Sequence, residues 1–149
     1  MTIDWTDPKA MVSKHFSVHE CTWLPSWGIH HIPSDDEKAN LIRQAQKMDQ
    51  IRDFVGKPVN IHCWIRPGSV NCPGSQYHGQ DYNAHVGGAS HSAHKLGLAT
   101  DWDCGEDCDT TRQTLLPELD NLDIRMENHQ GPWVHNDVMP PNPNRYFIP

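Results

Sequence analysis

Two short stretches of the chain combine histidine with aspartate. The first is SAHKLGLATD, which contains His94 and Asp101, and the second is WVHND, which contains His135. Taken alone, a histidine and an aspartate at this spacing are more often a surface pair. Together, two imidazoles and one carboxylate meet the needs of a catalytic zinc ion, which takes three protein ligands and leaves its fourth position to water. Such an ion lowers the pKa of the water to about 7. We therefore predict one Zn²⁺ per chain on these three residues.

The elements on either side have to bring the three residues together. Gly97 permits a tight bend between His94 and Asp101. Residues 98–103 (LATDWD) predict a short strand that carries the aspartate. IRME and WVHNDV predict a closing pair of strands, from which His135 would reach the same ion.

One long helix is predicted over residues 35–54. Ser34 is a good N-cap, and the three acidic residues that follow it suit the positive end of a helix. Apolar residues recur every three or four positions and form one buried stripe: Leu41, Ala45, Met48, Ile51 and Val55. Gly56 and Pro58 end the helix. After it, VNIHCWI alternates and predicts a strand that ends at Arg66.

The other segments have weaker signals. Residues 1–14 are expected to be a loose lead-in, and residues 15–33, interrupted by two prolines, to wrap the domain without regular structure. The polar stretch 67–92 is expected to be a long functional loop, because loops of that length are otherwise uncommon. Residues 106–120 predict a second helix, weakened by Pro117, and the tail PPNPNRYFIP is expected to be extended.

Length, composition and charge limit the classes of protein to which the chain can belong. The chain has 149 residues, 36% hydrophobic and 21% charged, which indicates one globular domain over residues 1–149. The net charge is -7 and the 12 Lys and Arg form no cluster, so nucleic acid is not expected as a partner. No apolar stretch approaches the roughly 18–20 residues that cross a bilayer, so no membrane partner is expected. The N-terminal MTIDWTDPKA does not fit a secretory signal, and synthesis in the cytoplasm is expected.

The five cysteines are odd in number, which argues against a complete disulfide framework and predicts free thiols: Cys21, Cys63, Cys72, Cys104 and Cys108. Cys104 and Cys108 are four residues apart, which lies within zinc-ligand spacing. A thiolate zinc module on this pair is therefore an alternative to the histidine site. A structural zinc site normally needs four ligands, and a second matching pair is absent from the sequence.

The order and spacing of these pieces resemble one family, the zinc D-Ala-D-Ala carboxypeptidases and related phage endolysin peptidases, which share a fold with hedgehog signalling domains. The resemblance covers about residues 14–149. It begins with HFSVHE and continues through GKPVNIHCWIR, YNAHVGGASHSAHKLGLATD and WVHNDV. It implies an α+β fold of the hedgehog/DD-peptidase type, in which a small antiparallel sheet has helices on one side and the zinc site on its open face.

The resemblance also implies roles for individual residues. His94 and Asp101 fall on the family's Ser-x-His-x-x-Gly-x-Ala-x-Asp motif and His135 on its Trp-Val-His motif, so all three would be zinc ligands. Ser92, in the first motif, would support the metal loop by hydrogen bonding and help to bind substrate. Arg66 falls on the strand-end arginine and would bind the substrate's carboxylate or polarise its carbonyl, because its planar fork suits a bidentate contact.

The general base has two candidates, because family members place it shortly before the last ligand at varying distance. Glu127 lies at the end of a predicted strand, eight residues before His135, and His129 lies six residues before it. A solvated charge at the strand edge is the alternative to a catalytic role for Glu127. Asp137 would point to the same face of a strand as His135 and would support the metal site.

Two departures from the family concern the substrate cleft. The segment from Arg66 to Asn83 is longer than in typical members, and the Gly-Tyr before the arginine reads Trp64-Ile65. The first would reshape the cleft and the second would alter its wall. Neither touches a predicted ligand.

The function that the resemblance implies is hydrolysis of a peptide bond in the stem peptide of bacterial peptidoglycan by a monomeric enzyme. Both a D-Ala-D-Ala carboxypeptidase and an endolysin-type endopeptidase fit, and the bond that is cut stays open. The lack of a signal peptide favours a phage lysin that acts on the cell wall after release. The alternative is a zinc-containing binding or structural module of the same fold without turnover.

Overall fold

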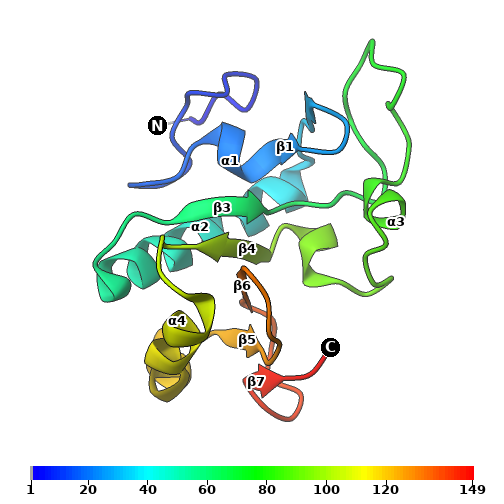
Figure 1. Cartoon of the computed structure of the whole chain (residues 1–149). Coiled ribbons are helices and arrows are strands. Elements are labelled where there is room, and N and C mark those ends of the chain that lie inside the picture. The colour runs from blue at the N-terminus through cyan, green and yellow to red at the C-terminus, as the bar shows by residue number, and fades with distance from the viewer. Residues whose placement is uncertain (1) are drawn as a thin grey trace.

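A computed structural model describes residues 2–149 (Figure 1). The fold is mixed α+β, as predicted, and contains two sheets. The helices are α1 (Val18–Thr22), α2 (Asp35–Val55), α3 (Tyr82–His85), α4 (Cys108–Leu115) and α5 (Leu119–Leu122), with 3₁₀ turns η1 (Ala93–Leu96) and η2 (Leu116–Glu118). The strands are β1 (Trp23–Leu24), β2 (Ile29–His30), β3 (Asn60–Cys63), β4 (Ala99–Asp103), β5 (Arg125–Glu127), β6 (Val134–Asp137) and β7 (Tyr146–Phe147). None of the described helices is long and apolar enough to cross a membrane.

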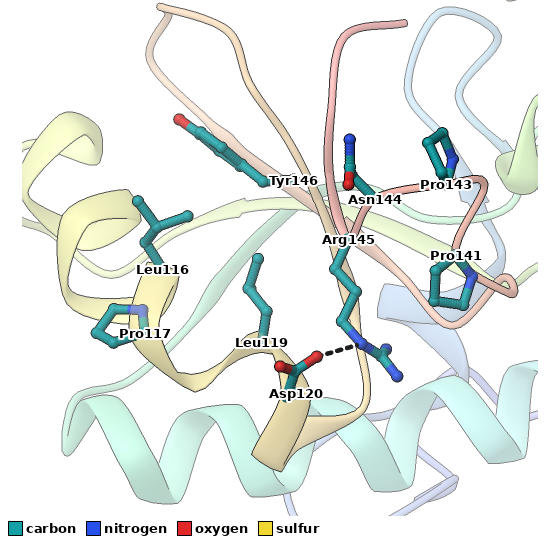
Figure 2. A pocket seen from close by; sticks show the side chains of 9 residues that line it. All are labelled: Leu116, Pro117, Leu119, Asp120, Pro141, Pro143, Asn144, Arg145 and Tyr146. Atoms are coloured by element: carbon teal, nitrogen blue, oxygen red, sulfur yellow. Dashed lines mark hydrogen bonds and ion pairs between the residues drawn. The ribbon is translucent and has the colours of Figure 1, made fainter.

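The larger sheet has the strand order β3-β4-β6-β5-β7. Its pairs are antiparallel, as predicted, except that β7 runs parallel to β5. The tail was expected only to be extended, and the expectation of a purely antiparallel sheet is wrong at this edge. The tail is held by Arg145, whose guanidinium lies 2.9 Å from a carboxylate oxygen of Asp120 (Figure 2) and 2.9 Å from one of Asp123. This anchor starts the last strand beside the start of β5, so the two strands run in the same direction.

Helix α2 confirms the predicted helix and runs behind the sheet in Figure 1. Ser34 and Glu37 form a reciprocal capping box, which satisfies two backbone N–H groups at the helix start. Gly56 ends the helix in the left-handed conformation, with φ of 68°. Four residues of the predicted stripe, Leu41, Ala45, Met48 and Ile51, are each 0% exposed, and the fifth, Val55, is partly buried.

The two faces of the sheet have different surroundings. Gln44 of α2 donates to the Thr100 hydroxyl at 3.1 Å, and that hydroxyl donates to Oδ1 of Asn136 at 3.2 Å. Thr100 and Asn136 therefore face α2. Because successive residues of a strand point to opposite faces, Asp101 and His135 point away from α2.

Residues 15–33 are more regular than expected. They form α1 and the β1–β2 hairpin, in which Trp23 pairs with His30. Ser17 and Glu20 make a second capping box, whose signal was missed because a five-residue helix shows no periodicity. The expected loose lead-in is also wrong, since Ile3, Trp5 and Ala10 pack against the core.

Three further elements differ from expectation in extent. The second helix breaks at Pro117 into α4, η2 and α5, because proline cannot donate a helical hydrogen bond. The strand predicted as VNIHCWI is only Asn60–Cys63, since Trp64 and Ile65 leave the ladder and enter the core, each 1% exposed. The long loop 67–92 contains the short helix α3.

Candidate metal centre

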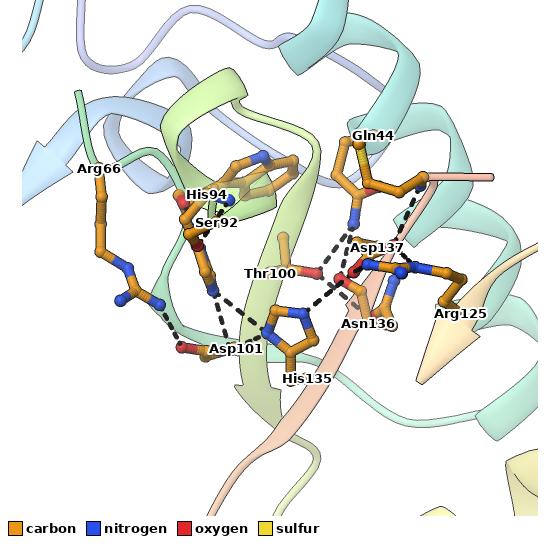
Figure 3. Close-up of polar contacts among 12 residues, drawn as sticks. Gln44, Arg66, Ser92, His94, Thr100, Asp101, Arg125, His135, Asn136 and Asp137 are labelled. Carbon is orange, nitrogen blue, oxygen red and sulfur yellow. Dashed lines mark hydrogen bonds and ion pairs between the residues drawn. The ribbon is translucent and has the colours of Figure 1, made fainter. Parts of the chain in front are cut away.

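His94, Asp101 and His135 meet on the face of the sheet opposite α2 (Figure 3). Nε2 of His94 lies 3.2 Å from Oδ1 of Asp101, and Nδ1 of His135 lies 2.9 Å from the same oxygen. The two imidazole nitrogens are 3.3 Å apart. Ligand atoms on a tetrahedral zinc, each at about 2.0–2.1 Å from the ion, lie about 3.3 Å from one another. The three donor atoms therefore fit the edges of one face of such a site.

Strand pairing and a tight turn produce this convergence. Asp101 of β4 and His135 of β6 are direct cross-strand partners. His94 reaches them from η1, which Gly97 ends with φ of 76°. A Cβ at this glycine would lie 2.9 Å from a methyl carbon of Leu41, so the turn packs against α2 too closely for a side chain. Ser92 caps the turn, and its hydroxyl accepts from the backbone N–H of His94 at 3.2 Å.

The second nitrogen of each imidazole is occupied. Nδ1 of His94 is 2.6 Å from the carbonyl oxygen of Trp64, and Nε2 of His135 is 3.3 Å from Oδ2 of Asp137. If Nδ1 of His94 and Nε2 of His135 carry the protons and donate, the lone pairs of Nε2 of His94 and Nδ1 of His135 are free to bind a metal ion. This is the usual arrangement of metal-binding histidines. Asp137 is 0% exposed and accepts from Arg125 at 2.7 and 2.8 Å. The predicted contact of Asp137 with His135 is thus confirmed.

The charges around the cluster favour a cation. Burial acts to raise the pKa of Asp101, but the imidazoles of His94 and His135 overcome it and hold the pKa well below its usual range. Burial acts to lower the pKa of His135, but hydrogen bonds to Asp101 and Asp137 raise it to about 9. For His94 burial dominates and lowers the pKa. Two ionised carboxylates therefore surround one protonated and one neutral imidazole, and a metal ion can take the place of the proton.

The cluster lines a cavity of about 380 Å³ that also contains Arg66, Ser92 and Glu127. Nη2 of Arg66 is 3.5 Å from Oδ2 of Asp101. β5 and β6 are adjacent antiparallel strands, as predicted, with Arg125 opposite Asp137 and Met126 opposite Asn136. Continuing this register by one residue places Glu127 beside His135.

The other candidate base lies elsewhere. The ring of His129 packs against Trp133, with ring centroids 5.1 Å apart, and it does not line the cavity. The exposed His91 does line the cavity and was not singled out from the sequence. It stands three residues before His94 in the ASHSAH segment, and that proximity was the only signal that could have found it.

Asn83 and Gly88 shape the wall beside Arg66. The Asn83 side chain is buried and donates to the carbonyl oxygens of Gly88 and Ala89 at 3.3 and 3.0 Å. A Cβ at Gly88 would lie 2.1 Å from Oδ1 of Asn83 and 3.0 Å from Nη1 of Arg66. The glycine therefore permits the loop to close over both side chains. The long segment 67–92 thus supplies one wall of the cavity.

Cys63 also reaches the cluster, although the sequence indicated only a free thiol. Its sulfur, a ring nitrogen of His94 and a carboxylate oxygen of Asp101 lie within 4.8 Å of one another. Burial raises the pKa of the thiol to about 11, against the opposing effect of the Arg66 charge. All five cysteines are free, as predicted. Cys104, half of the alternative thiolate pair, instead contacts the hydroxyl of Thr111 at 3.5 Å, outside the cavity.

A larger cavity of about 510 Å³ lies between η2, α5 and the tail (Figure 2). Its charged lining residues are Arg145 and Asp120, which pair with each other. Neither histidine nor cysteine lines it. The smaller cavity is therefore the stronger candidate for a functional site.

Comparison of the chain with known protein families, curated proteins and solved structures found no match. The resemblance to the zinc peptidases therefore stays a prediction. The case for a function rests on the geometry of the cavity and on its donor atoms.

Proposed function

We propose that the chain is a zinc-dependent peptidase that hydrolyses a peptide bond in bacterial peptidoglycan. The observation that carries this proposal is the convergence of His94, Asp101 and His135, with donor atoms 2.9–3.3 Å apart, in one cavity with Arg66 and Glu127. Two imidazoles and one carboxylate suit zinc, and three protein ligands are the number typical of a catalytic site. When bound, the ion would polarise the scissile carbonyl and lower the pKa of a water molecule.

Arg66 is the residue that would hold the substrate. Its side chain is 17% exposed at the cavity, and its guanidinium lies 3.5 Å from a carboxylate oxygen of Asp101. Its Nε is buried and has no hydrogen-bond partner among the described residues. A guanidinium with donors to spare can bind a substrate carboxylate in bidentate fashion or donate to a peptide carbonyl.

Glu127 is the residue that would handle the proton. It is half-buried on the same face of the sheet as His135 and borders the same cavity. An ionised carboxylate there would accept a proton from the attacking water and deliver it to the leaving amine. His129 packs against Trp133, which lines the cavity, but His129 itself does not line it, so the geometry favours Glu127 for this role.

The substrate class rests on the resemblance to the zinc peptidases. The cavity supports it, because the one proposed zinc ion per chain would border an open space in which a substrate could bind. The proposed enzyme is a monomer that acts on the stem peptide, either as a carboxypeptidase or as an endolysin-type endopeptidase. Such an enzyme would act on the cell wall after release from the cell that makes it.

Digestion of purified peptidoglycan, followed by mass analysis of the products, tests the proposal. The zinc-loaded chain is expected to release fragments that carry one new amine and one new carboxylate, and their masses identify the bond. Chain stripped by a chelator should release none, and added zinc should restore the reaction. A zinc-loaded chain that leaves peptidoglycan and short stem peptides intact would contradict it.

One observation favours a second function, a zinc-containing binding or structural module without turnover. Structural zinc sites are usually closed by four protein ligands. The Cys63 sulfur beside His94 and Asp101 offers a fourth. Zinc binding without any peptidoglycan cleavage would support this alternative.

A further inference from the structure

The position of Cys63 depends on an irregularity in the edge strand β3. Asn60 pairs with Asp103 and Ile61 with Trp102, so a regular ladder would place His62 opposite Asp101. The register shifts between Ile61 and Cys63, and Cys63 becomes the partner of Asp101 instead. Such bulges re-aim side chains and are common next to active sites.

The bulge decides which of two neighbouring residues, His62 or Cys63, stands opposite Asp101. The imidazole of His62 turns outward, is 39% exposed and pairs with Asp103. The Cys63 sulfur comes within 4.8 Å of donor atoms of His94 and Asp101, although Cys63 is not among the residues that line the cavity. The strand thus places a soft, monodentate donor next to the cluster and the imidazole of His62 beside Asp103.

The Cys63 sulfur has to move closer to the donor atoms of His94 and Asp101 before all of them can bind one ion. A thiolate on zinc at about 2.3 Å lies about 3.5 Å from a nitrogen or oxygen ligand of the same ion. The sulfur lies within 4.8 Å of the donor atoms of His94 and Asp101, and a change of the Cys63 side-chain rotamer would bring it closer to them. Buried cysteines are common as small apolar residues, and Cys21, with 0% exposure, is one in this chain. Cys63 differs because two metal donors and the Arg66 guanidinium surround it.

We propose that Cys63 is the fourth donor of the metal centre, so that the ion would be held by two imidazoles, one carboxylate and one thiolate. The inference rests on the metal site of the proposed function. With four protein ligands the fourth position would be closed, so the turnover proposed above would require the thiolate to leave the ion. The centre would then be latent and would favour thiophilic ions.

Cobalt(II) substitution tests the assignment on the full chain, because a cobalt–thiolate bond gives an intense near-ultraviolet charge-transfer band that nitrogen and oxygen ligands do not. The wild-type chain is expected to show the band at one cobalt per chain. Cys63→Ser should lose it and bind the metal on the order of tenfold more weakly. Cys72→Ser, which alters another half-buried cysteine away from the cavity, should keep both the band and the affinity. One bound cobalt without the band, or a band that survives in Cys63→Ser, would overturn the proposal.

Alkylation of the unmodified chain gives a second measurement that does not depend on the folding of a variant. Zinc should slow modification of Cys63 at least tenfold relative to chelator-treated chain, whereas modification of Cys72 should not change. Equal rates at Cys63 would count against ligation.

The two proposals fail separately. A thiolate band without peptidoglycan cleavage, in wild-type chain and in Cys63→Ser, would leave the fourth donor standing and remove the peptidase. Cleavage by a chain whose bound cobalt shows no thiolate band would support the peptidase and remove Cys63 as the fourth donor.

Discussion

Nε2 of His94 and Nδ1 of His135 face each other at 3.3 Å, although 41 residues separate them in the chain. Two lone pairs directed at each other repel, and either a proton on one ring or a metal ion bound by both nitrogens relieves that repulsion. Asp101 closes the triangle at 2.9 Å from His135. This relationship makes the triangle a candidate cation site, and its ligands can be tested one at a time.

Loss of any one of the three ligands should remove the metal. His94→Ala, Asp101→Ala and His135→Ala should each lose stoichiometric zinc, measured by metal analysis after dialysis, and should lose the thermal stabilisation that zinc gives the wild type. His91→Ala is the matched control, because His91 borders the same cavity but stays exposed. Full zinc occupancy in the His94 and His135 variants would contradict the ligand assignment.

Arg66 should matter for turnover but not for the metal. Arg66→Ala is expected to keep zinc and to lose about tenfold or more in kcat/KM, the usual scale for a charge-assisted hydrogen bond. Arg66→Lys should rescue it poorly, because a point charge cannot reproduce a bidentate fork. Steady-state kinetics on a stem peptide measures both. Wild-type rates in the lysine variant would show that only positive charge is needed.

Glu127 should carry the proton transfer. Glu127→Gln keeps size and polarity but cannot accept the proton, so it should bind zinc normally and lose about 10²–10⁴ in rate. His129→Ala, outside the cavity, should keep turnover within a few-fold of wild type. Near-normal rates in Glu127→Gln with an inactive His129→Ala would move the role to His129. Near-normal rates in both would favour the non-enzymatic module.

The contact of Gly88 with Asn83 predicts a double-mutant effect. Gly88→Ala should destabilise the fold by about 1–3 kcal/mol, the scale of overpacking, because its Cβ meets Oδ1 of Asn83 at 2.1 Å. In Asn83→Ala the clash is absent, so adding Gly88→Ala there should cost much less. Denaturant unfolding measures the coupling. Gly68→Ala is the control, since its Cβ meets only the flexible end of Lys95. Additive losses would argue against the contact.

The buried pair of His31 and Glu37 predicts an acid-sensitive contribution to stability. Burial acts to raise the pKa of Glu37, but hydrogen bonds from His31 and the Ser34 backbone lower it below the ordinary value of 4.5. The contribution is therefore present above about that pH and is lost as pH falls through the lower folded-state pKa. Glu37→Gln keeps the capping box. The wild type should lose its stability advantage over this variant in acid, measured by denaturant unfolding, and a constant difference would contradict the linkage.

Sequence signals within a single segment were enough to predict helix α2 and the strands that carry the candidate site residues. The cap at Ser34, the apolar stripe and Gly56 are all read within α2 itself, and the helix ends one residue from its predicted boundary. The strand that carries Asp101 and the strand pair that carries Glu127 and His135 were likewise predicted from short alternating runs. Residue types and spacing therefore determined which side chains are candidates for the site.

Tertiary structure decided what those side chains face. The parallel pairing of β7 depends on Arg145 meeting carboxylates more than 20 residues away, as its separations of 25 and 22 residues show. The place of Cys63 depends on a one-residue shift against β4. The shift placed the thiol of Cys63 opposite Asp101 and near His94, and it left the imidazole of His62 beside Asp103. Register is set by contacts between segments distant in the chain, and no pattern within either segment specifies it.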